Sequence, residues 1–235
     1  MSAPARVHAL VRDRDLAPPA DRRLLALLAL LDHDEHAPSS VRDAERATEV
    51  HLADSLSALD LPVVRNARRV ADLGSGAGFP GLALAIALPQ AHVALVESSS
   101  RKCAFLERAV AVAQLGNVEV VCTRVEEWAE GSSCHDLVTA RALGELALVC
   151  EYAAPLMTIG GSLVAWKGAV SIEELNAGEL AAAEVGLEPA GVVRASPYPG
   201  SETHCFHTYV KTAETPTRFP RRPGAARKRP LGHAP

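Results

Sequence analysis

The chain has 235 residues, 48% of them hydrophobic and 22% charged, which is enough for one α/β domain with a sizeable core. Only 4% of the residues are aromatic, which argues against a recognition surface built from stacked aromatic rings. The net charge is −4, but residues 211–235 carry seven basic side chains against one acidic side chain, so this segment has a charge of +6 and the rest of the chain −10.

This basic, proline-rich segment has two interpretations. It suggests local contact with a polyanion such as a nucleic acid. It is equally compatible with a solvated, disordered tail, and charge alone does not decide between the two.

Residues 1–20 are rich in proline and charge, so we expect a flexible N-terminus there. They contain no apolar segment of the kind that a signal peptide needs. The apolar stretch Leu24–Leu31 is too short to span a bilayer. We therefore expect a cytoplasmic protein without a membrane partner.

The cysteines show no metal-binding pattern. They contain no C-x-x-C pair, and their spacing matches no zinc site, so no bound metal is expected. In a cytoplasmic protein they are expected to be reduced and mostly buried. The five residues are Cys103, Cys122, Cys134, Cys150 and Cys205.

Helical spacing of apolar residues predicts two N-terminal helices. Asp21 can cap the first helix, which contains Leu24–Leu31. The second runs from about Ser40 to Leu59. Together they predict a helical layer before the first strand.

From Arg68 onward, short β-like runs alternate with helical ones, which implies a mostly parallel, doubly wound sheet. Two late β-like segments predict an antiparallel hairpin at the sheet edge. Residues 21–211 are therefore expected to form a single domain, followed by a basic tail over 212–235. The predicted strands are Arg69–Leu73, His92–Glu97, Val118–Thr123, Asp136–Ala140, Ser162–Lys167, Val192–Ala195 and His204–Val210; the predicted helices between and after the first five strands are Gly81–Leu88, Arg101–Leu115, Leu143–Met157 and Ile172–Val185.

A glycine-rich loop, Gly74–Gly81, follows the first predicted strand. In an open α/β sheet, ligands bind at the carboxyl ends of the strands, beside the first β-to-α turn. Glycines there allow positive φ and let the backbone approach a ligand closely. Such a loop can hold a dinucleotide or S-adenosylmethionine (AdoMet), although glycines can also serve a simple tight turn.

The spacing of the glycines favours AdoMet without excluding a dinucleotide. Counted from Gly74, the dinucleotide pattern G-x-G-x-x-G fails, because its sixth position is Phe79. Counted from Gly76 the pattern is met, but it then begins further from the strand and contains Pro80. We prefer the D-x-G-x-G-x-G interpretation, which places Asp72 near the methionine part of the ligand.

Glu97 ends the next predicted strand, about 25 residues after Asp72. A carboxylate there can accept hydrogen bonds from both hydroxyls of a ribose. This feature suits AdoMet and NAD alike. It also suits a structural role for Glu97 near the start of the following helix.

Several separated motifs resemble the RsmG (GidB) family, which methylates small-subunit (16S) ribosomal RNA to give 7-methylguanosine. The resemblance covers about residues 40–231, and the Phe-Pro-Gly extension of the glycine loop is specific to the family. Its anchors are His51–Leu56, Asp72–Gly81, Glu97–Ser98 with Arg101–Lys102 and Phe105–Leu106, Arg124–Glu127, Arg141–Ala142, Lys167–Gly168, and a C-terminal segment from Thr215 to Leu231 that is similar to that of Gram-positive members.

The resemblance implies a class I AdoMet-dependent methyltransferase with a Rossmann-like α/β sheet. It implies transfer of the methyl group of AdoMet to N7 of a guanine, with 16S rRNA or the small ribosomal subunit as partner. The residues expected to bind the cofactor are Asp72, Gly74, Gly76, Gly78, Phe79, Glu97, Val125, Glu126 and Arg141. The family usually carries Asn-Leu-Thr before the helix of His51; residues 37–43 differ, which leaves any contact made by that Asn in doubt.

Guanine N7 carries an in-plane lone pair, so methylation there needs positioning and electrostatics rather than a strong general base. Arg141 and Lys167, at predicted strand ends, are the expected catalytic residues, because each can contact the guanine carbonyl oxygen or a phosphate. Alternatively, each pairs with a nearby carboxylate. Further RNA contacts are expected from His51, Asp54, His204, Lys211, Arg218, Arg221 and Arg222.

Two other function classes remain open at this point. A nicotinamide-dependent oxidoreductase would need a catalytic Tyr-x-x-x-Lys, and no tyrosine here has a lysine four residues later. A non-catalytic RNA-binding protein would have no cofactor affinity. The sequence does not decide between naked RNA and the assembled subunit, or the oligomeric state, for which a monomer is expected.

Overall fold

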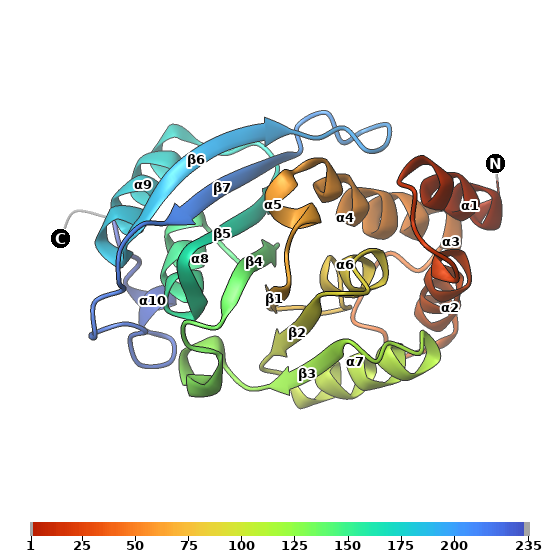
Figure 1. The fold of residues 1–235 in the computed structure, drawn as a ribbon, viewed down its shortest axis with the longest axis horizontal. Helices are drawn as coiled ribbons and strands as arrows, with labels where there is room; N and C mark the ends of the chain where they lie inside the picture. The colour runs from red at the N-terminus through yellow and green to blue at the C-terminus, as the bar shows by residue number, and fades with distance from the viewer. Residues whose placement is uncertain (1, 233–235) are drawn as a thin grey trace.

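The computed structural model describes residues 2–232 (Figure 1). Seven strands form one sheet in the order β3-β2-β1-β4-β5-β7-β6. Neighbours among β1 to β5 run parallel, whereas β7 runs antiparallel to both β5 and β6. The strands are β1 (Arg69–Leu73), β2 (His92–Glu97), β3 (Val118–Cys122), β4 (His135–Arg141), β5 (Met157–Lys167), β6 (Leu187–Arg194) and β7 (Cys205–Lys211). The predicted doubly wound α/β sheet with a terminal antiparallel hairpin is confirmed.

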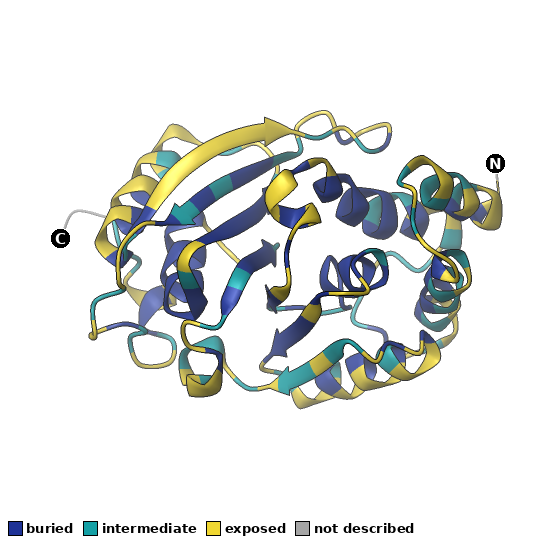
Figure 2. Cartoon of the chain, in the orientation of Figure 1, coloured by how far each residue is buried: buried dark blue, intermediate teal, exposed yellow. Residues whose placement is uncertain are grey.

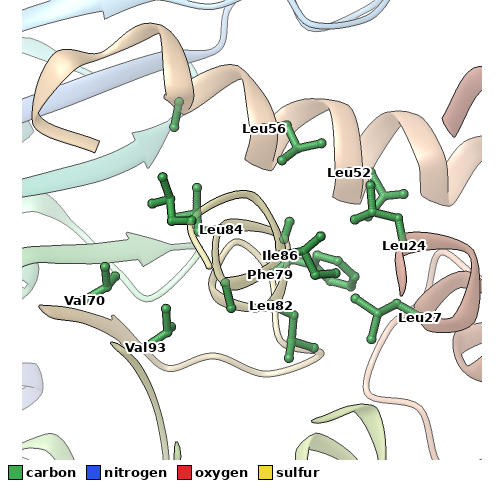
Figure 3. Close-up of a cluster of buried hydrophobic side chains, with 14 of the residues drawn as sticks. Leu24, Leu27, Leu52, Leu56, Val70, Phe79, Leu82, Leu84, Ile86 and Val93 are labelled. Carbon is green, nitrogen blue, oxygen red and sulfur yellow. The ribbon is translucent and has the colours of Figure 1, made fainter. Parts of the chain in front are cut away.

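Helices cover both faces of the sheet, and each face has its own apolar core. One core joins α2, α4, α6 and α7 to the sheet, and Figure 3 shows part of it, with Leu24, Leu56 and Phe79 around α6. The other joins α8 and α9 to the sheet. The longer helices are α1 (Ala3–Asp13), α2 (Ala20–His33), α6 (Gly81–Ala87), α7 (Ser100–Val112), α8 (Leu146–Ala153) and α9 (Ile172–Val185). The shorter ones are α3 (Ala44–Ala47), η1 (Thr48–Ala53), α4 (Asp54–Ser57), η2 (Ala58–Asp60), α5 (Pro62–Arg65), η3 (Val125–Glu127), η4 (Ala129–Gly131), η5 (Ala154–Leu156) and α10 (Ala225–Lys228).

The N-terminal layer is more ordered than the sequence predicts. Residues 3–13, expected to be flexible, form α1 against α2, because Val7 and Ala3 are buried there. The second predicted helix is present as a continuous helical stretch from α3 to η2, and its middle, η1, is π-helical. No helix within residues 2–232 combines the length and apolar character needed to cross a bilayer.

Two strands extend further than their patterns predict. β5 begins at Met157, before its predicted start at Ser162. The glycines at 160 and 161 suggest a turn in the sequence, but the strand continues through them, past an irregular register with β4. β6 also begins before its predicted start, at Leu187. It contains Pro189, which a central strand would not tolerate, but β6 lies at the edge of the sheet, where proline is allowed. Figure 2 shows this edge strand exposed along most of its length, whereas the central strands are buried.

The described part of the basic C-terminal segment packs against the domain and is not a solvated tail. Phe219 and Ala226 are buried in the same core as α8 and α9. A short helix, α10, follows and contacts α8. Residues 233–235, the end of the predicted tail, lie outside the described residues.

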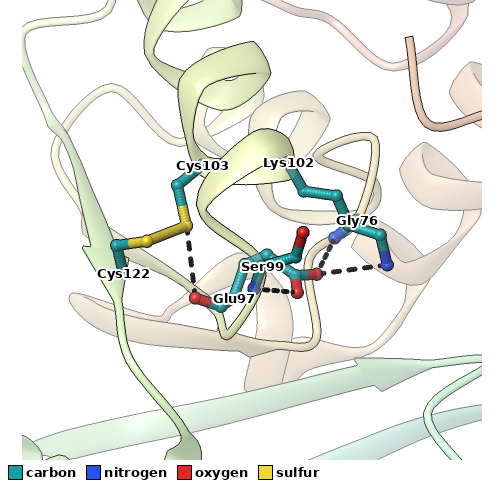
Figure 4. Close-up of a disulfide and its surroundings, with 6 residues drawn as sticks. All are labelled: Gly76, Glu97, Ser99, Lys102, Cys103 and Cys122. Atoms are coloured by element: carbon teal, nitrogen blue, oxygen red, sulfur yellow. Dashed lines mark hydrogen bonds and ion pairs between the residues drawn. A yellow bond between two sulfur atoms is a disulfide. The ribbon is translucent and has the colours of Figure 1, made fainter. Parts of the chain in front are cut away.

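The expectation that all five cysteines are reduced is wrong for one pair, because the structure joins Cys103 to Cys122 in a disulfide (Figure 4). Parallel pairing of β3 with β2 brings the end of β3 beside the start of α7, so the two Cα atoms lie 5.8 Å apart. A spacing of 19 residues does not reveal this proximity in the sequence.

Candidate functional site

The glycine loop turns sharply between β1 and α6. The N–H groups of Gly74 and Ser75 both donate to the carbonyl oxygen of Val96, which ties the loop to the end of β2. Gly74 and Gly78 have φ of +66° and +92°, a region that side chains rarely adopt. A Cβ atom on Gly78 would lie 2.2 Å from Leu82, so glycine is required there for space as well as for conformation.

Glu97 is buried at the end of β2, beside this loop, as Figure 4 shows. Its Oε2 accepts from the Gly76 N–H at 3.2 Å, and its Oε1 accepts from the Ser99 N–H at 2.9 Å. The Lys102 ammonium lies 3.6 Å from Oε2. These three contacts hold the carboxylate in one orientation, at the edge of a pocket.

We call this cavity of about 210 Å³ the glycine-loop pocket. Of the predicted cofactor residues, it brings together Gly74, Glu97, Val125 and Glu126. The remaining lining residues are Val96, Ser98, Lys102, Thr123, Arg124, Ala142, Leu143, Tyr152 and Arg227.

Asp72 and Phe79 lie behind the loop rather than in the pocket wall. The Thr139 hydroxyl donates to Oδ1 of Asp72 at 2.8 Å, and the Gly81 N–H donates to Oδ2 at 3.3 Å. Burial raises the pKa of Asp72 to about 6, against the opposing effect of these hydrogen bonds. Phe79 is buried and stacks on the His51 ring, with centroids 4.9 Å apart. Both side chains therefore support the loop from beneath.

A second cavity, of about 280 Å³, lies beside the first and shares Ala142 with it. We call it the Arg141 pocket; it is lined by Asp54, Arg141, Ala142, Gly144, Trp166, Lys167, Gly168 and His204. It brings together both predicted catalytic residues and two of the predicted RNA contacts.

The charges in the Arg141 pocket are already paired within the protein. The buried Asp54 carboxylate accepts from Arg141 Nη1 at 2.9 Å and from His204 Nδ1 at 3.0 Å. The Trp166 indole N–H donates to the backbone oxygen of Asp54 at 3.3 Å. Asp54, on α4, therefore organises side chains from β4 and the segment before β7 through its carboxylate, and a side chain from β5 through its backbone oxygen.

His51 is buried and is not available for direct contact with RNA. Arg141 Nη2 donates to its Nδ1 at 3.3 Å, so Nε2 carries the hydrogen and faces the Ser39 hydroxyl oxygen at 2.9 Å. Burial and the neighbouring Arg141 charge lower the pKa of His51 to about 4. The predicted RNA contact is thus replaced by a neutral imidazole that packs beneath the glycine loop.

Lys167 has the alternative role considered from the sequence, because it pairs with a carboxylate. Its ammonium forms an ion pair with Glu174 on α9 and donates to the Gly144 carbonyl oxygen at 3.1 Å. The side chain still lines the Arg141 pocket.

Two of the predicted RNA contacts in the C-terminal segment are engaged inside the protein. Lys211 is only 2% exposed, and its ammonium donates to the carbonyl oxygens of Ala154 and Met157. Arg221 forms a two-pronged ion pair with the buried Glu151. Arg218 pairs with Glu184 on the surface, and Arg222 is exposed. Lys211 and Arg221 were expected at an RNA surface because the sequence reveals their charge but not their depth.

Several wall residues of the glycine-loop pocket gave no sequence signal. Tyr152 lies in a helix 26 residues after Glu126, yet its hydroxyl donates to the Glu126 carboxylate at 2.9 Å. Arg227 reaches the pocket from α10, which composition assigned to a tail. Other wall residues lie in the motifs that carry the family resemblance, among them Ser98, Lys102, Arg124 and Ala142.

The Cys103–Cys122 disulfide lies immediately behind this pocket (Figure 4). It joins the first turns of α7, after Glu97, to the end of β3, just before Thr123. Cys103 Sγ lies 3.3 Å from the Glu97 carbonyl oxygen, a close contact rather than a hydrogen bond because a disulfide sulfur carries no hydrogen. Among the described residues, no group of three or more His, Cys, Asp or Glu is arranged to hold a metal ion.

Comparisons with known proteins agree on one family. A family model described as rRNA small subunit methyltransferase G matches residues 22–196. The ribosomal RNA small subunit methyltransferases G of Rubrobacter xylanophilus and Roseiflexus castenholzii are 41% and 40% identical to the chain. These alignments cover 81% and 82% of this chain, and 75% and 83% of the relatives.

Solved structures share the fold at lower sequence identity. Cofactor-bound Rv0187 from MTB has a TM-score of 0.56 at 22% identity, over 80% of this chain and 89% of that chain. A predicted O-methyltransferase from Agrobacterium tumefaciens has a TM-score of 0.53 at 24% identity, over 68% and 81%. At these identities the likeness establishes the fold alone.

Proposed function

The chain belongs to the rRNA small subunit methyltransferase G family, and we propose that it transfers a methyl group from AdoMet to N7 of a guanine in 16S rRNA. The observation that carries this proposal is the pair of adjoining pockets at the carboxyl edge of the sheet. One suits a nucleoside-containing cofactor and the other suits a base, and they meet at Ala142. This arrangement allows a methyl donor and an acceptor to be held in line.

The glycine-loop pocket suits AdoMet on the chemistry of its walls. Glu97 presents a fixed carboxylate for the two ribose hydroxyls, as expected at the end of the second strand. Gly74 leaves room for the ligand, and Val96, Val125 and Leu143 supply apolar contact. When bound, AdoMet supplies an activated methyl group.

In the Arg141 pocket, Arg141 is the residue best placed to bind the guanine. It donates three hydrogen bonds within the protein, to Val50 O, Asp54 Oδ2 and His51 Nδ1. A guanidinium has five N–H donors, so two remain. We propose that they donate to the guanine carbonyl oxygen, which lies on the same edge as N7. Lys167 has one N–H beyond its two partners, and we propose a phosphate or base contact for it.

No residue in the Arg141 pocket needs to act as a strong base. The N7 lone pair is available without loss of a proton, so orientation and charge stabilisation are sufficient. Asp54 serves the reaction indirectly, because it fixes the orientation of Arg141 and His204. Because the proposed substrate is ribosomal RNA, we also propose that the enzyme acts in the cytoplasm.

The decisive experiment is methyl transfer from labelled AdoMet to small ribosomal subunits from a strain that lacks the enzyme. Subunits and naked 16S rRNA are compared, and the modified nucleoside is identified after digestion. We expect label in 7-methylguanosine. Measurable binding of S-adenosylhomocysteine without transfer to either RNA would reject the proposed substrate while leaving the cofactor assignment intact.

A further inference from the structure

A segment near the end of the described chain forms a strap against the glycine-loop pocket, to which it contributes Arg227. We use "C-terminal strap" for residues 215–231. The Thr215 hydroxyl donates to the Val185 carbonyl oxygen at 3.0 Å, Phe219 is buried, and Ala226 is buried on α10. Leu231 packs against the same core at the far end. The strap is therefore anchored at both ends and in its middle.

A buried charge pair fixes the centre of the strap. Glu151 on α8 is almost fully buried, and Arg221 Nε donates to its Oε1 at 2.6 Å, while Nη2 donates to Oε2. The Glu151 hydrogen bond raises the pKa of Arg221. Arg221 Nη2 also donates to the Arg229 carbonyl oxygen at 2.9 Å, which closes the strap around α10. Removing Arg221 would leave the Glu151 carboxylate buried and unpaired, so this contact favours the docked position.

The strap is joined directly to the wall of the glycine-loop pocket. Oε1 of Glu126 accepts from the Gly224 N–H at 2.9 Å and from the Tyr152 hydroxyl at 2.9 Å. Glu126 lies in η3, the segment that follows β3 and lines the pocket. One oxygen of a predicted cofactor residue is thus used to hold the strap.

Arg227, on α10, extends from the strap into the pocket wall. Its Nη2 donates to the Leu143 carbonyl oxygen at 3.4 Å. It also hydrogen-bonds to the Tyr152 hydroxyl. A guanidinium has five N–H donors, so three remain for a ligand. In the pocket it lies with Tyr152 and Glu126, in the part formed by the segment after β3.

The position of Glu97 in the pocket indicates which part of the cofactor lies beside Arg227. Glu97 marks the position of the ribose, and the segment Val125–Glu126 lies beyond it along the sheet edge, past the end of β3. The methyl group of AdoMet must face the Arg141 pocket, which adjoins this one at Ala142, so we expect the adenine on the opposite side of the ribose. Its ring nitrogens are hydrogen-bond acceptors, and a planar guanidinium can donate to such nitrogens or stack on the ring.

We propose that the C-terminal strap is part of the AdoMet site and that Arg227 binds the adenine end of the cofactor. The inference rests on the proposed function only for the identity of the cofactor, not for the identity of the RNA. It gives the basic segment a role other than the phosphate contact that its charge suggests.

Two arginines on the strap provide a matched test. Arg227→Ala removes the proposed contact, whereas Arg222→Ala removes an exposed side chain that makes no hydrogen bond or ion pair within residues 2–232. Binding of S-adenosylhomocysteine and of adenosine is measured by calorimetry, with thermal unfolding of each unliganded variant as the control for folding. We expect Arg227→Ala to weaken both ligands about tenfold, the loss of one hydrogen bond to a charged group. Arg222→Ala should stay within about twofold.

Hydrogen exchange supplies a second readout that a merely structural role would not produce. S-adenosylhomocysteine should slow exchange of the amides in 219–228 in the wild-type protein, and this protection should be reduced in Arg227→Ala.

The outcomes separate this proposal from its alternatives. Unchanged affinity for both ligands overturns it, and a loss for S-adenosylhomocysteine without one for adenosine would place Arg227 at the methionine end instead. A raised KM for ribosomal subunits with unchanged ligand affinity would make Arg227 an RNA contact and would also overturn it. If the wild-type protein binds both ligands but does not methylate RNA, the substrate assignment fails while the strap is still tested. Absence of any binding by the wild-type protein would reject the cofactor and the strap together.

Discussion

The glycine-loop pocket and the Arg141 pocket share Ala142, but they hold their charges differently. In the glycine-loop pocket, the Glu97 carboxylate is bound by backbone N–H groups of Gly76 and Ser99, with Lys102 at 3.6 Å. In the Arg141 pocket, the Asp54 carboxylate is bound by side chains 87 and 150 residues further along the chain. The first arrangement depends on local backbone shape, and the second depends on the whole domain being folded.

This difference predicts separate failures. A change in the glycine loop should abolish cofactor binding while most of the fold survives, because the partners of Glu97 are local. A change at Asp54 should release two charged or polar side chains and cost both stability and catalysis, while cofactor affinity is largely kept.

The largest expected effect is that of Gly74→Asp on cofactor affinity. The new side chain would start at a φ of +66°, 2.7 Å from Leu143, and would place a second carboxylate in the pocket of Glu97. Aspartate tolerates this φ better than most residues, so the fold should survive. We expect S-adenosylhomocysteine affinity to fall more than about a hundredfold, beyond 2.7 kcal/mol.

The matched control is Gly116→Asp, at a position where an added Cβ meets nothing within 4 Å. It should bind S-adenosylhomocysteine as the wild-type protein does. Near-normal binding by Gly74→Asp would show that the ligand lies elsewhere.

The next largest effect is expected from Asp54→Asn, which keeps the shape of the side chain and removes its charge. Arg141 would then be left without its carboxylate in a mostly buried site, so we expect a loss of about 3 kcal/mol in the free energy of unfolding. Methyl transfer should fall about a hundredfold because Arg141 is no longer held in place. Urea denaturation and single-turnover transfer measure the two losses, and S-adenosylhomocysteine affinity should change less than about threefold.

Glu184→Ala is the comparison for this change, because it breaks the exposed pair with Arg218. It should cost less than about 1 kcal/mol and leave activity unchanged. Equal losses of unfolding free energy in the two variants would mean that the buried Asp54 network stabilises the fold no more than an exposed ion pair does.

The same contrast explains how much the sequence could predict. The ends of β1, β2 and β3 were predicted to within a residue, because short valine-rich runs between glycine-rich or polar turns have a strong local pattern. Glu97 followed from its place at a strand end. The family resemblance, carried by contiguous motifs, gave the enzyme class, which the family match then confirmed.

The network of Asp54 could not be predicted in detail, because its members come from distant segments. Its charged members also belong to residue types that usually lie at the protein surface. The strap escaped prediction for a related reason: its arginines have the composition of a solvated tail, and only the fold reveals Glu151 and Glu126, 70 and 98 residues away from their partners. Burial of Lys211 is the clearest case, since lysine is among the residues least expected in a core.

A smaller effect, on the pH dependence of stability, is expected at His51. This side chain links the two pockets because it accepts a hydrogen bond from Arg141 and stacks on Phe79 of the glycine loop. Its pKa is lowered to about 4 from the usual 6.5 of a histidine, so between these values the unfolded chain binds more protons than the folded one. Stability from this group is present above pH 6.5 and is lost as the pH falls toward 4. Between pH 7 and pH 5 the loss should be about 1–2 kcal/mol.

His51→Gln should flatten this dependence, as measured by urea denaturation of both proteins at pH 7 and pH 5. Asp72 acts in the opposite direction, because its raised pKa makes the folded state bind more protons between 3.8 and about 6. Asp72 is present in both proteins, so its contribution cancels in the difference between them. Identical pH dependence in the two proteins would contradict a buried, neutral His51.

The smallest expected effect is that of Lys102→Ala, and its size is the sharpest test of local construction in the glycine-loop pocket. Lys102 lies 3.6 Å from Glu97, but its side chain is 38% exposed, so water screens the interaction. If Glu97 is held mainly by the N–H groups of Gly76 and Ser99, loss of the lysine should weaken S-adenosylhomocysteine only about two- to threefold, less than 1 kcal/mol. The effect should also shrink as salt is raised from about 0.05 to 0.5 M, because the Debye length falls over that range. A loss of tenfold or more that persists at high salt would mean that the lysine, rather than the backbone, sets the carboxylate, and the contrast between the two pockets would disappear.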